Sequence, residues 1–167
     1  MLMRFLKLSY FFILFIVTSK SFAADAYKVQ NNALVLPNPI EFDKHSYDVK
    51  DTLDPMLKMV VNYLISKPYI TKLRIEGHVY TEKSPEENMK LSLQRAAIIS
   101  YYLTANGIDC NRLIPVAFGD TKPIAPTDEC NLITNTRVAF YNAELNYKAV
   151  DGFAVDGFAV KVFEPCE

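Results

Sequence analysis

The sequence predicts an α/β fold, an α+β sandwich in which two helices pack on one face of a small mixed sheet. Apolar residues recur at helical spacing in two segments, 54–66 and 85–106, whereas shorter runs before, between and after them have the pattern of strands. A chain that alternates strands with helices forms a layer of helices against a sheet. Without the first 23 of the 167 residues, the 144 that remain are enough for one such domain with its own core.

The first 23 residues are expected to be a cleaved signal peptide. Arg4 and Lys7 give a positive start, Leu8–Val17 is a short apolar core, and Ser21–Ala23 places small residues at the −3 and −1 positions of a cleavage site. The apolar run is shorter than the ~20 residues that span a bilayer, so we expect an exported product without a transmembrane segment, and a retained anchor is the alternative.

The rest of the chain is acidic. Three of the 18 Lys and Arg residues lie in the leader, whereas all 19 Asp and Glu residues lie beyond it. A nucleic-acid-binding protein would show a basic face, and this charge balance argues against one. The sequence favours a polymer or protein partner over a nucleic acid.

The N-terminal part of the domain is predicted to hold short strands and one helix. Residues 25–32 look irregular, and Ala33–Leu36 and Ile40–Phe42 are short extended runs separated by a Pro-Asn-Pro turn. A helix is predicted from about Asp54 to Ser66, because its apolar residues have helical spacing and Pro55 suits a first turn.

A strand and a longer helix follow. Thr71–Val79 alternates apolar and charged residues, which is typical of a half-buried strand. The helix is predicted from Pro85 to about Asn106, because Ser84 and Glu87 form a capping box at its start. Two more extended runs complete the predicted order: Leu113–Gly119 and Arg137–Glu144.

The second helix carries polar residues on its apolar stripe. Asn88, Ser92 and Arg95, at i, i+4 and i+7, share one face with Leu91 and Ile98. A helix that serves only to stabilise the fold would carry Leu or Ala at these positions. We therefore expect a polar cleft at the N-terminal end of this helix.

These residues resemble a known family. Gly77-His78, eleven residues before an NxxLSxxRA run that starts at Asn88, is similar to the OmpA-like C-terminal domain family, which includes the peptidoglycan-associated lipoproteins and the MotB-type stators. Further matches are Gly107-Ile108, Arg112-Leu113, Phe118-Gly119, Pro123–Ala125 and Asn135–Val138. The resemblance covers roughly residues 35–144 and implies a βαβαββ domain, which we place at residues 24–146.

The resemblance also implies a ligand. In the family, the cleft holds the diaminopimelate residue of the peptidoglycan stem peptide; the helix arginine takes a carboxylate, and an aspartate takes the ammonium. By this match Arg95 grips the carboxylate, Asn88 orients the loop or bonds the ligand, and Arg137 supports the cleft. The alternative for Arg95 is an internal ion pair with Asp43 or Glu76.

One position departs from the family pattern. Tyr80 stands where the family has the aspartate, and the intact spacing of the motif leaves no room for a gap. A tyrosine offers an ammonium a cation–π contact of ~0.5–2 kcal/mol, against ~1.5–3 kcal/mol for a charge-assisted hydrogen bond. Glu82 and Asp43 are the candidate substitutes. We expect His78 and Ser92 to pack within the fold.

The sequence favours a protein that attaches non-covalently to the cell wall and tethers an envelope complex to it. The alternative is a scaffold that keeps the fold, has lost the ligand and acts through assembly in a secretion or motility complex. We do not expect an enzyme, because the cleft offers no acid–base pair and no activated nucleophile. The expected location is the periplasm, at the cell wall or outer membrane.

The cysteines predict a disulfide. An exported chain meets an oxidising compartment, so one bridge is expected among Cys110, Cys130 and Cys166. Cys110 and Cys130 flank a predicted strand and are the predicted pair, while a pairing of either with Cys166 stays open. No common zinc-ligand spacing relates the cysteines to His45 and His78, and we expect neither a metal nor another cofactor.

Residues 147–167 are a predicted C-terminal tail. The sequence Val-Asp-Gly-Phe-Ala occurs twice in tandem, at 150–154 and 155–159. Asp156-Gly157 fits a two-residue hairpin turn. We interpret the repeat as a small duplication, and an edge strand that docks a partner is the alternative.

Overall fold

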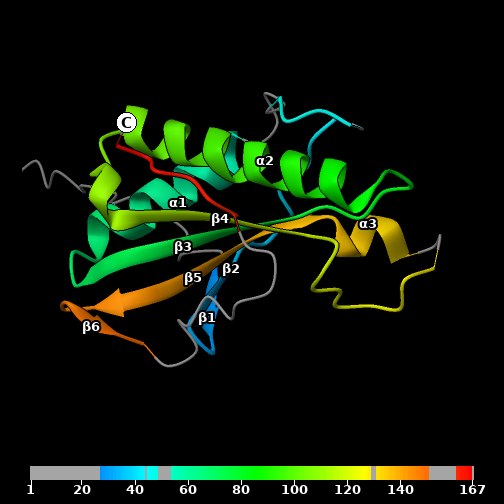
Figure 1. Ribbon diagram of the computed structural model, residues 1–167. Helices are drawn as coiled ribbons and strands as arrows, with labels where there is room; N and C mark the ends of the chain where they lie inside the picture. Colours follow the sequence, from blue (N-terminus) through cyan, green and yellow to red (C-terminus); the bar gives the residue numbers. More distant parts are fainter. Residues whose placement is uncertain (1–26, 44, 49–53, 129–130, 151–160, 167) are drawn as a thin grey trace, which may run out of the picture.

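The computed structural model describes residues 27–43, 45–48, 54–128, 131–150 and 161–166, and it confirms the predicted sandwich of helices on a mixed sheet (Figure 1). The elements in chain order are β1 (Lys28–Gln30), β2 (Ala33–Val35), α1 (Asp54–Ser66), β3 (Ile70–His78), α2 (Pro85–Ala105), the 3-10 helix η2 (Cys110–Arg112), β4 (Leu113–Gly119), α3 (Leu132–Asn135), β5 (Arg137–Leu145), β6 (Lys148–Ala149) and β7 (Lys161–Val162). The predicted signal peptide and nearly all of the tandem repeat lie outside the described residues.

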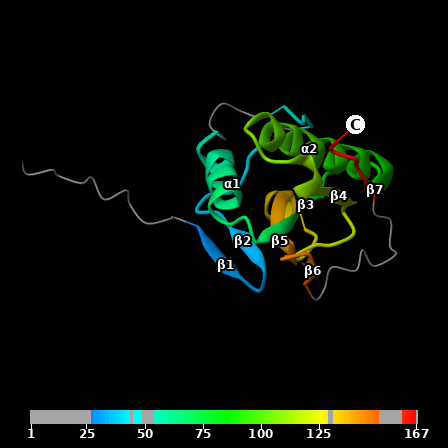
Figure 2. The same cartoon turned by 90° about the vertical axis from the view of Figure 1, so that its left-hand side faces the viewer.

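The strand order is β1-β2-β5-β3-β4-β7, with β6 paired to β5. The neighbours β3 and β4 are parallel, and α2 is the crossover between them; the other pairs are antiparallel. The path β2-α1-β3-α2-β4-β5 is the predicted βαβαββ arrangement, with the short α3 inserted before β5. Figure 2 shows α1 and α2 together on one face of the sheet.

Two predictions for the N-terminal strands are wrong. Residues 28–30, expected to be irregular, form β1 and pair with β2 as a hairpin. Its two-residue turn is Asn31-Asn32, and both residues have positive φ, 48° and 64°, which asparagine tolerates better than most side chains. The expected strand at 40–42 is reduced to an isolated bridge at Phe42.

The core lies between the two helices and the sheet. Leu57 and Leu64 of α1 and Ile99 of α2 are fully buried against Leu73 and Ile75 of β3. The capping box that predicted the start of α2 is present, since the Ser84 side chain accepts from the Glu87 N–H and the Glu87 carboxylate accepts from the Ser84 N–H at 3.1 Å. No helix within the described part of the chain is long and apolar enough to cross a membrane.

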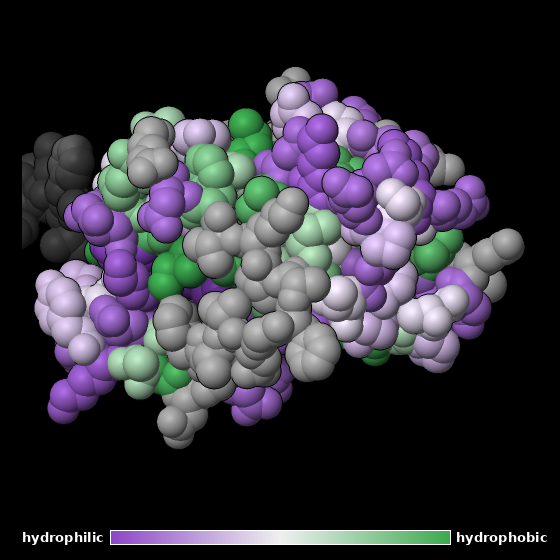
Figure 3. Space-filling model, viewed as in Figure 1, coloured by the Kyte–Doolittle hydropathy of each residue, from purple (hydrophilic) through white to green (hydrophobic). Residues whose placement is uncertain are grey.

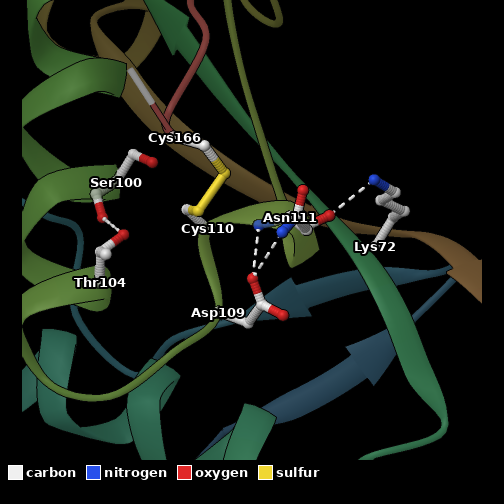
Figure 4. Close-up of a disulfide and its surroundings, with 7 residues drawn as sticks. All are labelled: Lys72, Ser100, Thr104, Asp109, Cys110, Asn111 and Cys166. Carbon is white, nitrogen blue, oxygen red and sulfur yellow. Dashed lines mark hydrogen bonds between the residues drawn. A yellow bond between two sulfur atoms is a disulfide. The ribbon is translucent and has the colours of Figure 1, made fainter.

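The predicted Cys110–Cys130 disulfide is wrong, because Cys110 is bonded to Cys166. The strand β7, just before Cys166, pairs antiparallel with β4, and this pairing brings the chain end beside the start of β4, where η2 carries Cys110. The two Cα atoms are 5.3 Å apart, a usual separation for a disulfide. Figure 4 shows the bridge next to Asp109 and Ser100.

The bridge predicts which cysteine matters for stability. Cys110 and Cys166 are 56 residues apart, and closing a loop of that size stabilises by ~4 kcal/mol in the chain-entropy model. We expect Cys166→Ser to lower the free energy of unfolding by ~2–4 kcal/mol under oxidising conditions, as measured by urea denaturation. Cys130→Ser is the control, and a larger loss in that variant would contradict the Cys110–Cys166 pairing.

Candidate functional site

Arg95 is a buried guanidinium held by backbone carbonyls. It is 5% exposed. Its Nε donates to the carbonyl of Ser46 at 2.9 Å and its Nη2 to the carbonyl of Asp43 at 3.2 Å. The guanidinium carbon lies 4.5 Å from the centre of the Phe42 ring. Burial lowers the pKa of Arg95 to about 10, so the group is still charged at neutral pH.

No internal ion pair links Arg95 to a carboxylate of the described residues. Asp43 contributes its backbone carbonyl, and its side chain is exposed. Glu76 instead bonds Arg74 at 2.6 Å and His78 at 3.1 Å. The side chains at 74, 76 and 78 point to the face of β3 opposite that of Gly77, which lies against α2. Arg95 therefore carries a desolvated positive charge without a described counter-charge.

Asn88 ties together the loops beside the start of α2. It is 1% exposed. Its Oδ1 accepts from the Thr81 hydroxyl at 2.5 Å, and its Nδ2 donates to Asp120 Oδ2 at 3.1 Å and to the carbonyl of Lys83 at 3.4 Å. These contacts join Asn88 to the loop, and its two predicted roles, orienting the loop and bonding the ligand, stay predictions. The partner Asp120 was not identified from the sequence.

Tyr80 is fixed through its backbone. The Thr136 hydroxyl accepts from the Tyr80 N–H at 2.9 Å and donates to the Tyr80 carbonyl at 2.9 Å. The Tyr80 side chain is half-buried; burial and then the charge of Asp120 raise its pKa, and Arg137 offsets this in part. The phenol is therefore neutral at physiological pH and supplies no charge for an ammonium.

The other predicted site residues lie around this loop. Arg137, at the start of β5, donates from Nη1 to the carbonyls of Asn135 at 3.2 Å and Lys122 at 3.4 Å, so it braces the segment between β4 and β5. Burial lowers the pKa of Arg137. Glu82 is exposed on the β3–α2 loop. Figure 3 shows hydrophilic residues gathered over the N-terminal half of α2 and the loop above it.

Ser92 packs within the fold, as predicted. It is 0% exposed; its hydroxyl donates to the Met89 carbonyl at 2.8 Å and accepts from the Gly119 N–H at 3.0 Å. The backbone of Ser92 requires glycine at position 77, since a Cβ at position 77 would lie 2.1 Å from the Ser92 carbonyl oxygen. The motif residues Gly77 and Ser92 thus bring α2 into backbone contact with β3.

A pair of buried serines on α2 tests this contact. Ser92→Ala should destabilise by ~1–3 kcal/mol, because it removes the acceptor of the buried Gly119 N–H. Ser100 is equally buried, and its hydroxyl has no hydrogen-bond partner among the described residues. Ser100→Ala should therefore be neutral or slightly stabilising. Thermal or urea unfolding measures both, and equal losses would contradict the role of Ser92.

His78 is also a packing residue. It is 1% exposed and stacks on Phe118, with ring centres 5.3 Å apart. Because ionised Glu76 is an acceptor only, Nε2 of His78 is the donor in their 3.1 Å contact, and Nδ1 is buried with no partner among the described residues. Burial lowers the pKa of His78, and the charges of Arg137 and Lys122 act in the same direction.

This arrangement predicts a loss of stability in acid. A group whose pKa is lowered on folding binds protons more readily in the unfolded state. For His78, the stability of the fold therefore falls as the pH drops below the ordinary histidine pKa of 6.5. The pKa of Glu76 is also lowered: burial raises it, but the His78 and Arg74 contacts outweigh burial, and its own effect begins only below 4.5. Between about pH 6.5 and 4.5 the free energy of unfolding should fall because His78 takes up a proton more readily in the unfolded state.

His78→Gln tests this assignment. It removes the titrating ring and keeps a donor for Glu76. We expect urea denaturation at a series of pH values to give a flatter profile in that window than the parent protein. A profile with an unchanged slope would assign the acid sensitivity to other groups.

Parts of this chain are similar to known proteins. A family model described as the OmpA family matches residues 41–134. A peptidoglycan-associated lipoprotein of Haemophilus influenzae is 30% identical over 101 residues, which are 60% of this chain and 65% of that protein. A photosystem I P700 chlorophyll a apoprotein A2 of Gloeobacter violaceus is 35% identical over 96 residues, 56% of this chain but 11% of that protein.

A solved structure is also similar. The peptidoglycan-associated lipoprotein from Burkholderia pseudomallei matches with a TM-score of 0.55 and 26% identity, over 66% of this chain and 90% of that one. The chain spans less than two thirds of the length of either curated relative described above. The family match covers more than half of the chain and includes Asn88, Arg95 and Asp120. The chain belongs to the OmpA family.

Proposed function

We propose that this protein binds peptidoglycan without covalent attachment and anchors to the bacterial cell wall. The observation that carries the proposal is Arg95, a buried cation without a described carboxylate partner. Burying a charge is costly unless it is paired, and a planar guanidinium suits a carboxylate from a ligand. Backbone carbonyls at 43 and 46 fix the guanidinium and leave its positive charge for such a partner.

The proposed ligand is the diaminopimelate of a stem peptide. The relatives from Haemophilus influenzae and Burkholderia pseudomallei carry the name peptidoglycan-associated lipoprotein. By analogy we place this protein in the periplasm, exported by the N-terminal signal peptide, at the cell wall or outer membrane, where it would tether an envelope complex. No bond is made or broken in this function, and no cofactor takes part.

A second function is favoured by one observation at position 80. Tyr80 presents a neutral phenol where the family pattern places an aspartate, so the ammonium contact at this position is weakened. In this second function the domain keeps its fold as a scaffold and acts through protein assembly in a secretion or motility complex. Binding to isolated cell wall separates the two functions.

The test is co-sedimentation of the leaderless protein with purified sacculi of the diaminopimelate type. We expect the parent protein to pellet and Arg95→Ala to bind about ten-fold to a hundred-fold more weakly, because a charge-assisted contact of ~1.5–3 kcal/mol is lost. Lys90→Ala is the matched control, since it removes an exposed positive charge from the same helix. Circular dichroism must show that each variant is folded.

Two other outcomes contradict the proposal: the first favours the scaffold, and the second places the wall contact away from Arg95. If the parent protein stays in solution but Tyr80→Asp pellets, the fold can bind the wall and the natural site has lost this capacity. If Arg95→Ala and the parent protein pellet equally, the wall contact lies elsewhere and the Arg95 site is wrong.

A further inference from the structure

We propose that Asp120 supplies the negative charge that position 80 lacks, and that it takes the ammonium of a ligand whose carboxylate lies on Arg95. The inference rests on the proposed function and names the second half of its site. The ligand class is an amine-bearing carboxylic acid in which both groups are charged, as at the free end of a diaminopimelate side chain.

Asp120 is held at the loop that contains Tyr80. It directly follows β4, is half-buried, and its Oδ2 accepts from Asn88 Nδ2 at 3.1 Å. Asn88 also holds Thr81, the neighbour of Tyr80, through their 2.5 Å contact. One amide therefore joins the carboxylate at 120 to the loop where the family pattern places its aspartate.

The charge of Asp120 is unpaired within the described residues. The described ion pairs are Arg74–Glu76, His78–Glu76 and Lys83–Glu87. A carboxylate has two oxygens and about four acceptor positions, and the described contact with Asn88 uses one of them. The carboxylate is close enough to Tyr80 to raise the pKa of its phenol, so the negative charge lies beside the ring.

Asp120 and Arg95 both connect to one stripe of α2: Arg95 is a residue of the helix, and Asp120, which follows β4, is bonded to Asn88 on that stripe. Asn88, which donates a hydrogen bond to Asp120, lies seven residues before Arg95, and this separation corresponds to a rise of ~10 Å along the helix axis. Helical side chains lean toward the N-terminus, which extends the guanidinium toward the Asn88 end. In this proposal the two opposite charges, each without a described counter-charge, bind the two ends of one ligand. Glu82 and Asp43, the substitutes predicted from the sequence, are exposed and are not bonded to Asn88.

The experiment varies both the protein and the ligand. Asp120→Asn removes the charge but keeps an oxygen that can accept from Asn88. Sacculi treated with acetic anhydride lose their free ammonium groups and keep their carboxylates. We expect the parent protein to bind acetylated sacculi about ten-fold more weakly than native sacculi, and Asp120→Asn to show the same loss on native sacculi. On acetylated sacculi the two proteins should bind equally, since the partners of one contact are not additive.

Two more variants complete the design. Asp109→Asn is the matched control, because it makes the same change near the other end of α2, where Asp109 caps η2. It should bind native sacculi like the parent protein. Tyr80→Asp combined with Asp120→Asn should restore binding to native sacculi, because the aspartate returns to its family position.

The outcomes separate this inference from the proposed function. If Arg95→Ala loses binding but Asp120→Asn does not, the protein is a wall anchor and the role of Asp120 is wrong. If the parent protein and Arg95→Ala bind native sacculi equally, the wall contact lies elsewhere, and both the Arg95 site and the role of Asp120 are wrong. Should Asp120→Asn fail to fold in a melting experiment, the parent protein decides alone, since unchanged binding to acetylated sacculi overturns the ammonium contact.

Discussion

The site depends on the backbone contact between β3 and α2. At Gly77 the strand comes so close to the helix that a Cβ would lie 2.1 Å from the carbonyl oxygen of Ser92. The Ser92 hydroxyl then takes the N–H of Gly119 and so fixes the end of β4 to the same turn of the helix. Asn88, one turn earlier, reaches the residues that follow both strands. A larger residue at 77 would separate these layers and the side chains they place.

Buried charges have different partners on the two faces of β3. On the face away from the helices, Glu76 is paired with Arg74 and His78, so its charge is compensated within the fold. On the helix side, Arg95 is as deeply buried but is bonded to backbone carbonyls, which are neutral. A fold optimised for stability alone would pair or remove such a charge. This contrast is the physical reason to read Arg95 as part of a binding site.

Local rules predicted most of the fold. The bounds of α1 and β4 agree with the predicted ranges, because proline, helical spacing and a compact apolar run are local signals. The hairpin of β1 and β2 was missed, since Asn31-Asn32 is a weaker turn signal than Asn-Gly. The disulfide was predicted wrongly because Cys166 reaches Cys110 only through the pairing of β7 with β4, which is a long-range contact.

The same distinction applies to the site. Arg95 and Asn88 could be named from a motif on one helix, whereas Asp120 lies 32 residues from Asn88 and meets it through the sheet. An ammonium responds to where a negative charge lies in space, and the segment of chain that supplies the charge is immaterial. The change to tyrosine at position 80 therefore need not remove the negative end of the site. Family members should therefore be compared by the total charge of the side chains that lie beside Asn88. A motif centred on Gly77 does not include Asp120 and so does not give that charge.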